Sequence, residues 1–330
     1  MKAPTITIVT PSFNQGQFIE ETLRSVLDQG LPDLEYIVID GGSSDSTVEI
    51  LQRYEGRLAH WVSEPDLGQA DALNKGFSLG TGEIVGYLNS DDLYEPGCLA
   101  RVVADFRSGP DRAWHAYPVE DFSAEGPQRI EPAPRLSSRV GSVPAETAAN
   151  DLLQWVLGRV GLHQPGVFWR REQWAALGGF DTRYHYAFDR HFFMKLVAAG
   201  YPLVCHAGPP AARFRLHGES KTVTRRRGVD NPFLRERMRI CDEFERMLPS
   251  ADRKQARRLR TEDAISTGWR MFHEGAPRWS CWRWLARLAL SRPDSLRRRY
   301  FWGSAARFLV QPRRPPVQPR RPPAGEEGTR

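Results

Sequence analysis

The first hundred residues predict an α/β fold, in which a mostly parallel sheet carries helices on both faces. Two observations predict it. Short apolar, β-branched runs alternate along the chain with segments whose apolar residues recur at helical spacing. Polar residues also follow each apolar run where it ends. Strands that alternate with helices are typical of parallel sheets, because each helix crosses back over the sheet between two strands.

The predicted elements of this first part follow in a regular order. Strands are expected at 5–10, 34–40, 58–62 and 83–88, and helices near 19–30, 46–54 and 69–79. The first strand should end at Pro11, and Ser46 with Glu49 forms a capping-box pattern at the second helix. Pro96 is expected in the first turn of a fourth helix.

The parallel arrangement places the polar residues that follow the four strands at one edge of the sheet. They are Asn14, Asp40, Asp66 and the run 89–92. Ligands of open α/β sheets bind beyond the carboxyl ends of the strands. This edge is therefore the expected binding site.

The second part of the chain is less regular at first and then becomes helical. Residues 110–150 are rich in Pro, Ser and Ala and are expected to form a loop or hairpin insertion. Order should return with helices at 151–160, 172–177 and 189–200 and with strands at 166–169, 203–206 and 211–216. From about 232 the pattern is helical and rich in arginine, and 311–323 contains a direct Gln-Pro-Arg-Arg-Pro-Pro repeat. That tail is expected to be disordered.

Charge is distributed unevenly over the 330 residues. The net charge is +6, but residues 251–330 contain 19 Lys and Arg against 7 Asp and Glu, which leaves about −6 for residues 1–250. Such a division suggests two different partners. The four cysteines lie far apart without C-x-x-C spacing, which favours thiols in a reducing compartment. The sequence has no signal-peptide pattern and no uncharged apolar run of roughly 20 residues. A cytoplasmic location is expected.

Asp91 and Asp92 are the first candidates for chemistry. Two adjacent carboxylates just past a buried strand provide hard oxygen ligands of the kind that Mg²⁺ or Mn²⁺ prefers. A metal held there would offset the charge that builds on a diphosphate leaving group. The local sequence is equally compatible with a helix cap followed by an exposed turn acid.

Five motifs around this acid pair favour the metal-binding interpretation over the helix cap. They are Thr10-Pro11-Ser12-Phe13-Asn14, Ile39-Asp40-Gly41-Gly42-Ser43-Ser44-Asp45, residues 63–76 (SEPDLGQADALNKG), Thr81-Gly82-Glu83 and Leu88-Asn89-Ser90-Asp91-Asp92. Together they closely resemble the nucleotide-binding half of the family 2 glycosyltransferases, which have the GT-A fold. The resemblance spans about residues 4–100 and resumes around 160–221. It implies a GT-A type, Rossmann-like sheet and an inverting sugar transferase that uses a nucleotide-diphosphate sugar and a divalent metal, Mg²⁺ or Mn²⁺.

The resemblance also implies roles for residues that match the family's motifs. Pro11 and Asn14 would shape the nucleotide pocket, and Asp40 would bond the base, with a turn residue before Gly41 as the alternative. Gly68 would permit close approach of the ligand. The other residues implied to bind the nucleotide sugar are Asp71, Asn74, Asn89 and Asp92, although capping or surface solvation would account for Asn74 equally well.

Asn89 departs from the family's commonest pattern, in which the first acid of the D-x-D step is Asp. An amide can bond ribose but contributes less to a metal, so Asp91 becomes the main ligand and Asp92 a helper. Relatives often place a histidine where His217 stands, and that residue completes the predicted metal set of Asp91, Asp92 and His217. Lys221 would offset phosphate charge. A surface-loop histidine remains the alternative for His217.

Asp189 is the predicted general base. Inversion needs a base on the face opposite the leaving diphosphate, to take the proton of the acceptor hydroxyl. In similar family members an acid pair opens the helix at this place. Here the pair reads Phe188-Asp189, so only Asp189 can serve. The alternative is that Asp189 caps the helix that follows. His163 and Gln164 are weaker candidates for the acceptor site.

The C-terminal region gives two open interpretations. Aromatic and leucine residues alternate with arginines through 275–310, a pattern that suits an anionic membrane surface or a helical subdomain packed on the transferase. No nucleic-acid-binding module accompanies the charge, so nucleic acid is not an expected partner. The predicted domains are a transferase at 1–225 (nucleotide-binding half 1–105, acceptor half 106–225), a basic helical region at 226–310, and the tail at 311–330.

These observations predict a glycosyltransferase of bacterial polysaccharide or cell-envelope synthesis. It would move a sugar from a nucleotide-diphosphate sugar to a glycan or lipid-linked acceptor, in the cytoplasm or at the inner face of the plasma membrane. One alternative is a sugar-1-phosphate nucleotidylyltransferase, although 11–17 has none of the basic residues expected for it. Another is a catalytically silent module that binds nucleotide sugars.

Overall fold

The computed structural model describes residues 5–109, 111–131, 155–157, 162–218, 232–273, 277–297 and 299–310. The chain forms two compact units. The first comprises Met1–Arg225 and Pro232–Ala256, and the second comprises Arg226–Asn231 and Arg257–Arg330.

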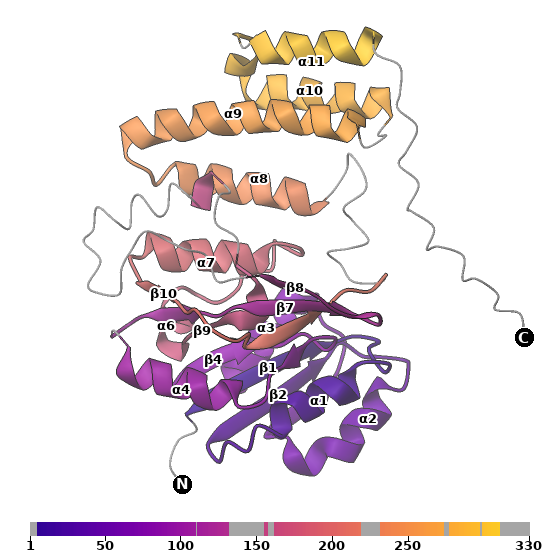
Figure 1. The fold of residues 1–330 in the computed structure, drawn as a ribbon, viewed down its shortest axis with the longest axis vertical. Coiled ribbons are helices and arrows are strands. Elements are labelled where there is room, and N and C mark those ends of the chain that lie inside the picture. Colours follow the sequence, from indigo (N-terminus) through magenta and orange to yellow (C-terminus); the bar gives the residue numbers. More distant parts are fainter. Residues whose placement is uncertain are drawn as a thin grey trace, which may run out of the picture. The chain divides into compact units, whose positions relative to one another are not determined.

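A seven-stranded sheet forms the centre of the first unit (Figure 1). Its order is β10-β6-β9-β4-β1-β2-β3. The strands are β1 (Ile6–Ser12), β2 (Leu34–Asp40), β3 (His60–Ser63), β4 (Ile84–Tyr87), β6 (Trp114–Ala116), β9 (Val167–Arg170) and β10 (Leu203–Cys205). β9 runs antiparallel to both of its neighbours, and the other pairs are parallel. The predicted mostly parallel sheet is confirmed.

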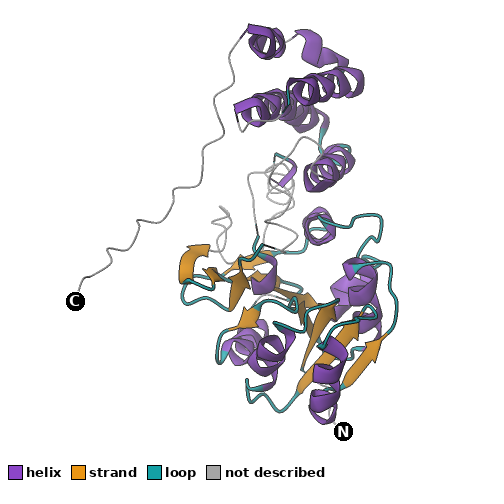
Figure 2. Ribbon diagram, turned by 90° about the vertical axis from the view of Figure 1, so that its right-hand side faces the viewer, coloured by secondary structure: helices purple, strands orange, loops and turns teal. Residues whose placement is uncertain are grey.

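Helices cover both faces of this sheet, as Figure 2 shows from the side. They are α1 (Ile19–Leu27), α2 (Thr47–Tyr54), α3 (Gln69–Leu79), α4 (Cys98–Ser108), α6 (Arg171–Ala176) and α7 (Phe188–Ala198), and α8 (Pro232–Glu245) packs on α7. Alternate residues of a strand point to opposite faces. Accordingly, Ile8 packs with α1, α2 and α4 in one core, whereas Val9 packs with α3 and α7 in the other.

A smaller second sheet lies beside residues 89–92, called the acid step below, and explains how residues distant in the sequence reach it. Its order is β5-β11-β7-β8, with β5 (Leu93–Tyr94), β7 (Val119–Ser123), β8 (Gly126–Glu131) and β11 (Ala212–Arg215). β5 follows residue 92 directly, and β11 pairs with it through Ala212 opposite Tyr94. The chain that leaves β11 is therefore carried back to the end of β4.

Local details differ from the sequence prediction in four places. The segment 110–150, expected to be a loop or hairpin insertion, includes the β7–β8 hairpin but also contributes β6 to the central sheet. β1 continues through Pro11 to Ser12, because β4 ends opposite Val9 and no strand on that side needs the missing N–H. Ser46 makes no side-chain cap; Asp45 Oδ1 instead accepts from the Thr47 backbone N–H at 3.0 Å. Pro96 precedes α4, which begins at Cys98. Most of the helix predicted at 151–160 lies outside the described residues.

The C-terminal helices form a core of their own. Here α9 (Ser250–His273) is followed by α10 (Arg278–Ser291), the short 3-10 helix η3 (Pro293–Arg297) and α11 (Arg299–Val310). Within the second unit Trp284 is buried, and its indole N–H donates to the Ala264 carbonyl at 2.8 Å. Among the described residues no helix has the length and apolar character required to cross a membrane. The predicted tail at 311–330 lies outside the described residues.

Candidate active site

The acid step follows β4 and meets the segment after β11. Asp91 Oδ2 lies 2.8 Å from His217 Nε2, and both side chains keep part of their surface exposed. The Phe18 ring lies against the imidazole with centroids 4.7 Å apart. The structure thus brings together two of the three predicted metal ligands, although they are 126 residues apart in sequence.

Asp92 faces inward instead. It is 1% exposed, and its two carboxylate oxygens accept from the Arg215 backbone N–H at 2.9 Å and from the Asn89 amide at 3.1 Å. Burial, and after it the neighbouring charge of Asp91, raises the pKa of Asp92 well above its ordinary value. Its role as a helping metal ligand stays a prediction.

Asn89 is the centre of an amide network beneath the acid step. Its carbonyl accepts from Gln69 Nε2 at 2.6 Å, and its amide donates to Asp92 and to Gln164 Oε1 at 3.3 Å. Gln164 in turn donates to the Tyr87 carbonyl at 2.7 Å. An amide can donate and accept at once, which a carboxylate cannot, so the Asn at this position supplies a donor that holds Asp92.

Arg215 braces the acid step from β11. Its Nε donates to the Asp91 carbonyl at 2.8 Å, and its Nη2 pairs with Glu21 Oε2 at 2.5 Å. The guanidinium also stacks over the rings of Phe18 and Phe122, at 4.9 and 4.5 Å. Sequence reasoning assigned no role to Arg215. The available signal was its position two residues before the candidate histidine.

The ends of β1 and β2 are tied into one loop system. The Asp40 carboxylate is fully buried and accepts from the Ser43 backbone N–H at 2.8 Å, the Ser43 hydroxyl at 2.5 Å and the Ser63 hydroxyl at 2.6 Å. Asn14 has a φ of 54° and accepts from the Ser44 N–H at 2.9 Å. Pro11 is buried in β1 beside these residues. Their predicted contacts with a nucleotide stay predictions.

The loop after β3 makes a sharp turn at Gly68. Its φ of 109° is a conformation that side-chain-bearing residues rarely adopt, and Asp66 Oδ1 accepts from its N–H at 2.7 Å. Asp71, in the first turn of α3, accepts from the Leu67 N–H at 3.1 Å. Phe13 is 60% exposed, and the space above Gly41 is bordered by Phe13 and Asp66.

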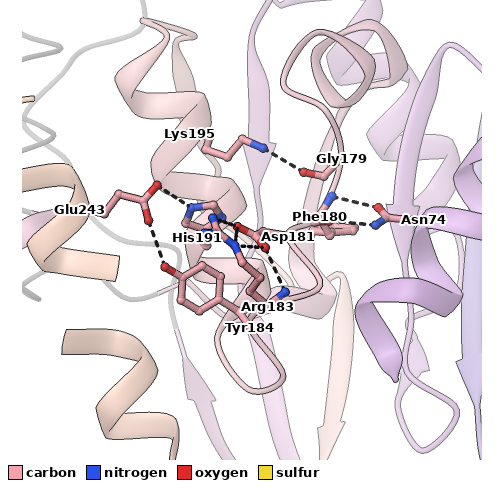
Figure 3. A network of polar contacts seen from close by, with 9 residues as sticks. All are labelled: Asn74, Gly179, Phe180, Asp181, Arg183, Tyr184, His191, Lys195 and Glu243. Atoms are coloured by element: carbon pink, nitrogen blue, oxygen red, sulfur yellow. Dashed lines mark hydrogen bonds and ion pairs between the residues drawn. The ribbon is translucent and has the colours of Figure 1, made fainter. Parts of the chain in front are cut away.

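Asn74 ties α3 to the loop that leads into α7 (Figure 3). Its carbonyl accepts from the Phe180 N–H at 2.9 Å, and its amide donates to the Phe180 carbonyl at 2.8 Å. Lys195, on α7, donates to the Gly179 carbonyl at 3.0 Å. A contact between Asn74 and a sugar, as predicted, would use its second amide hydrogen.

Asp189 lies in the first turn of α7, where Ala187 is the N-cap and makes no side-chain cap. It is partly buried, and its Oδ1 accepts from the Arg190 backbone N–H at 2.6 Å. Burial raises the pKa of Asp189 to about 6, against the lowering effects of that hydrogen bond and of the Arg190 charge. A carboxyl with such a pKa is suited to proton transfer near neutral pH.

The buried phenol of Tyr87 lies within the electrostatic influence of both Asp189 and the acid step. Burial raises the pKa of Tyr87 well above its ordinary value, and the charges of Asp189 and Asp92 raise it further. The Tyr87 and Phe188 rings lie 6.2 Å apart, which places the start of α7 against the end of β4. The fold thus brings Asp189 and the acid step to one region.

The donor set at Asp91 and His217 is compatible with a divalent metal. A carboxylate oxygen and an imidazole nitrogen within 2.8 Å of each other can ligate one ion, and both types suit Mn²⁺. Within the described residues no group of three or more His, Cys, Asp or Glu side chains stands ready to hold a metal. Further ligands would come from the substrate diphosphate and water, as is usual for Mg²⁺ and Mn²⁺ sites.

The remaining candidates lie around this region. His163 Nδ1 lies 3.8 Å from Asp121 Oδ1 and packs its ring against Phe214, while Gln164 belongs to the amide network described above. Lys221 lies outside the described residues.

Comparison with known proteins decides the family. Residues 7–137 match the model of the glycosyl transferase family 2. An uncharacterised glycosyltransferase of Mycobacterium tuberculosis is 30% identical over 203 residues, which cover 61% of this chain and 72% of that protein. The chain belongs to glycosyl transferase family 2. A putative teichuronic acid biosynthesis glycosyltransferase of Bacillus subtilis, TuaG, is 40% identical to this family 2 enzyme over 101 residues, 30% of this chain and 40% of TuaG.

Solved structures confirm the GT-A fold of this family 2 protein. A fragment of S. aureus TarS (1–349) in complex with UDP-GlcNAc superposes with a TM-score of 0.56 at 15% identity, covering 78% of this chain and 71% of that fragment. The mannosyltransferase PcManGT of Pyrobaculum calidifontis, in complex with GDP-Man and Mn²⁺, gives a TM-score of 0.50 at 21% identity over 94% of this chain and 88% of PcManGT.

Family membership establishes the general activity. This family 2 protein is a glycosyltransferase. The nucleotidylyltransferase alternative is therefore wrong. The family does not itself identify the acceptor, the stereochemistry or the catalytic residues, which depend on the site described above.

Proposed function

We propose that this transferase inverts the anomeric centre of its donor, with Asp189 as the general base and with Asp91 and His217 as the ligands of a divalent metal. Asp189 would accept the proton of the acceptor hydroxyl as that oxygen attacks the anomeric carbon from the face opposite the leaving diphosphate. Its raised pKa, about 6, makes it ionised at neutral pH and still basic enough to take a proton.

The acid step would receive the departing diphosphate. Asp91 and His217 present two ligand atoms on the same side, and Arg215 and Asn89 hold that arrangement from below. A bound metal would offset the charge that develops on the leaving group. Asp92, held by its two donors, would act mainly by fixing the backbone of the step.

The nucleotide would lie at the loops that follow β1, β2 and β3. Asp40, Asn14 and Pro11 shape these loops, Gly68 and Asp71 form the turn into α3, and Phe13 offers an exposed ring for stacking. The two solved relatives hold UDP-GlcNAc and GDP-Man, which supports a nucleotide-diphosphate sugar as the donor. The teichuronic acid relative supports a glycan or lipid-linked acceptor of the cell envelope.

The observation that carries this proposal is that the start of α7, with Phe188 next to Asp189, packs on Tyr87 at the end of β4, and that the charges of both Asp189 and Asp92 act on the Tyr87 phenol. The test is turnover of a panel of UDP- and GDP-sugars with Mn²⁺, followed by NMR of the product's anomeric proton. An anomeric configuration opposite to that of the donor is expected. Retention of configuration would overturn the assignment of Asp189 as base.

The C-terminal unit is proposed to bind an anionic membrane surface. Trp279 and Trp302 are 60% and 59% exposed, and Arg283 stacks on the Trp279 ring at 4.8 Å. Exposed indoles beside arginines suit the headgroup region of acidic lipids. Sedimentation with phosphatidylglycerol vesicles should fall when both tryptophans are changed to Ala. Met247→Ala, which removes an equally exposed apolar side chain of the first unit, is the matched control. Equal sedimentation of the double variant and the wild type would contradict this proposal.

A further inference from the structure

The turn before α7 is held by a carboxylate from another helix. Glu236, on α8, accepts from three consecutive backbone N–H groups: His185 at 2.9 Å through Oε1, and Tyr186 at 2.7 Å and Ala187 at 2.9 Å through Oε2. Such charge-assisted bonds are short and strong. The carboxylate also lies near the N-terminus of α7, where the helix dipole favours negative charge. Three bonds to three successive residues fix the path of the chain.

A second carboxylate of α8, that of Glu243, also contacts this segment (Figure 3). Glu243 accepts from the Tyr184 hydroxyl at 3.0 Å, and its other oxygen lies 3.4 Å from His191 Nε2. Tyr184 and His191 bracket the turn and the first residues of α7. The segment is thus tied to α8 at both ends, while Asn74 and Lys195 anchor the preceding loop.

These contacts determine the orientation of Asp189. It stands two positions after Ala187, so the direction of its side chain follows from the path of the turn. We propose that Glu236 is a positioning residue for Asp189, and that it holds the start of α7 in the orientation that proton transfer from the acceptor requires. This inference rests on the proposed function, because it assumes that Asp189 is the base.

A purely structural role for Glu236 can be distinguished from a positioning role by the pH–rate profile. The charged and titratable groups that face Asp189 are Arg190 on its own helix, Glu236 on α8 and Tyr87 on β4. The negative charge of Glu236 contributes to the raised pKa of Asp189, whereas Arg190 opposes it. Removal of the Glu236 charge should therefore move the acid limb of the pH–rate profile to lower pH, which a loss of stability alone would not do.

The experiment is kinetic analysis of the full-length enzyme carrying Glu236→Gln, with saturating Mn²⁺ and acceptor. Misplacement of a catalytic group by about 1 Å costs on the order of a hundredfold, so kcat should fall by roughly tenfold to a hundredfold. The KM for the donor should be unchanged, and the acid limb should shift to lower pH. Glu236→Asp keeps the charge on a shorter side chain, so it should restore the acid limb but only part of kcat.

Two further variants make the outcome decisive. Asp242→Asn removes a carboxylate from the same helix and should leave kcat and the pH profile as in the wild type. In an Asp189→Asn background, Glu236→Gln should cause no further loss, because the group that it positions is gone. A wild-type kcat and acid limb in Glu236→Gln, with Asp189→Asn inactive, would overturn the positioning role and leave the base assignment intact. Wild-type turnover in Asp189→Asn would overturn both.

Discussion

The two acidic centres of this enzyme are built in different ways. The acid step at 89–92 is held by neighbouring strands: the amide of Asn89 and the backbone of Arg215 occupy both oxygens of Asp92. Asp189 is held through its own helix, whose start is tied to α8 by Glu236. The acid step is fixed by the edge of the central sheet. The position of Asp189 depends instead on α8, a helix that follows the strands of that sheet in the sequence. The base can therefore be repositioned with less disturbance than the metal site.

The largest effect is expected at the acid step. Asp91→Ala removes one of the two candidate ligands, and a bound metal contributes several kcal/mol of charge stabilisation. Metal-dependent turnover should fall by roughly a hundredfold to a thousandfold. The rate over a range of Mn²⁺ concentrations measures this loss. Wild-type turnover at saturating Mn²⁺ would show that Asp91 does not hold the metal.

The ionised side chain of Asp189 should lower the free energy of unfolding at neutral pH. The pKa of Asp189 is about 6 in the folded enzyme and near 3.8 in an unfolded chain, so the unfolded state ionises first as pH rises. As pH rises between these two values, the folded enzyme loses at most about 3 kcal/mol of stability. The loss is smaller than this limit because part of the side chain stays solvated. Asp189→Asn should therefore be more stable to urea than the wild type at pH 7.5, with no difference at pH 3.5. Equal stability at both pH values would contradict the raised pKa.

Arg215→Lys tests the brace between the second sheet and the acid step. Lysine keeps the charge but loses the Nε bond to the Asp91 carbonyl and the stacking on Phe18 and Phe122. We expect about a tenfold loss in kcat/KM, because that bond and its orientation together contribute 1–2 kcal/mol. Arg213→Lys is the matched control, since Arg213 lies on the same strand and stacks on Phe122 at 5.0 Å. Equal losses in the two variants would argue against a specific brace.

The smallest effect on turnover is expected for Asn89→Asp, which acts on stability instead. This change replaces a donor to Asp92 by a second negative charge, so the metal-free protein should lose about 1–2 kcal/mol of stability. Mn²⁺ should recover part of the loss, because the new carboxylate adds a hard ligand. Thermal unfolding with and without Mn²⁺ measures both effects. A metal-free variant as stable as the wild type would show that the Asn89 donor does not support Asp92.

Sequence reasoning found the residues that periodicity and motif order reveal. The strands follow from short apolar, β-branched runs, the helices between them from the 3.6-residue period, and the polar edge at Asp40 and Asn89 from the residues that end those runs. Arg215 and Glu236 could not be found in this way, because their partners lie 124 and about 50 residues away. The N-cap is Ser46, as predicted, but the side chain that bonds the first turn is that of Asp45, because both residue types can accept there and only the backbone path selects between them.

The most direct test of the account is the pH dependence of kcat for the wild type and for Asp189→Asn, with saturating Mn²⁺, donor and acceptor. The wild-type rate should rise with pH through about 6, where Asp189 loses its proton. Asp189→Asn should retain donor binding, its kcat should fall by roughly a hundredfold, and its residual rate should lack that limb. A variant that turns over at the wild-type rate with the same acid limb would contradict the assignment of Asp189 as the base.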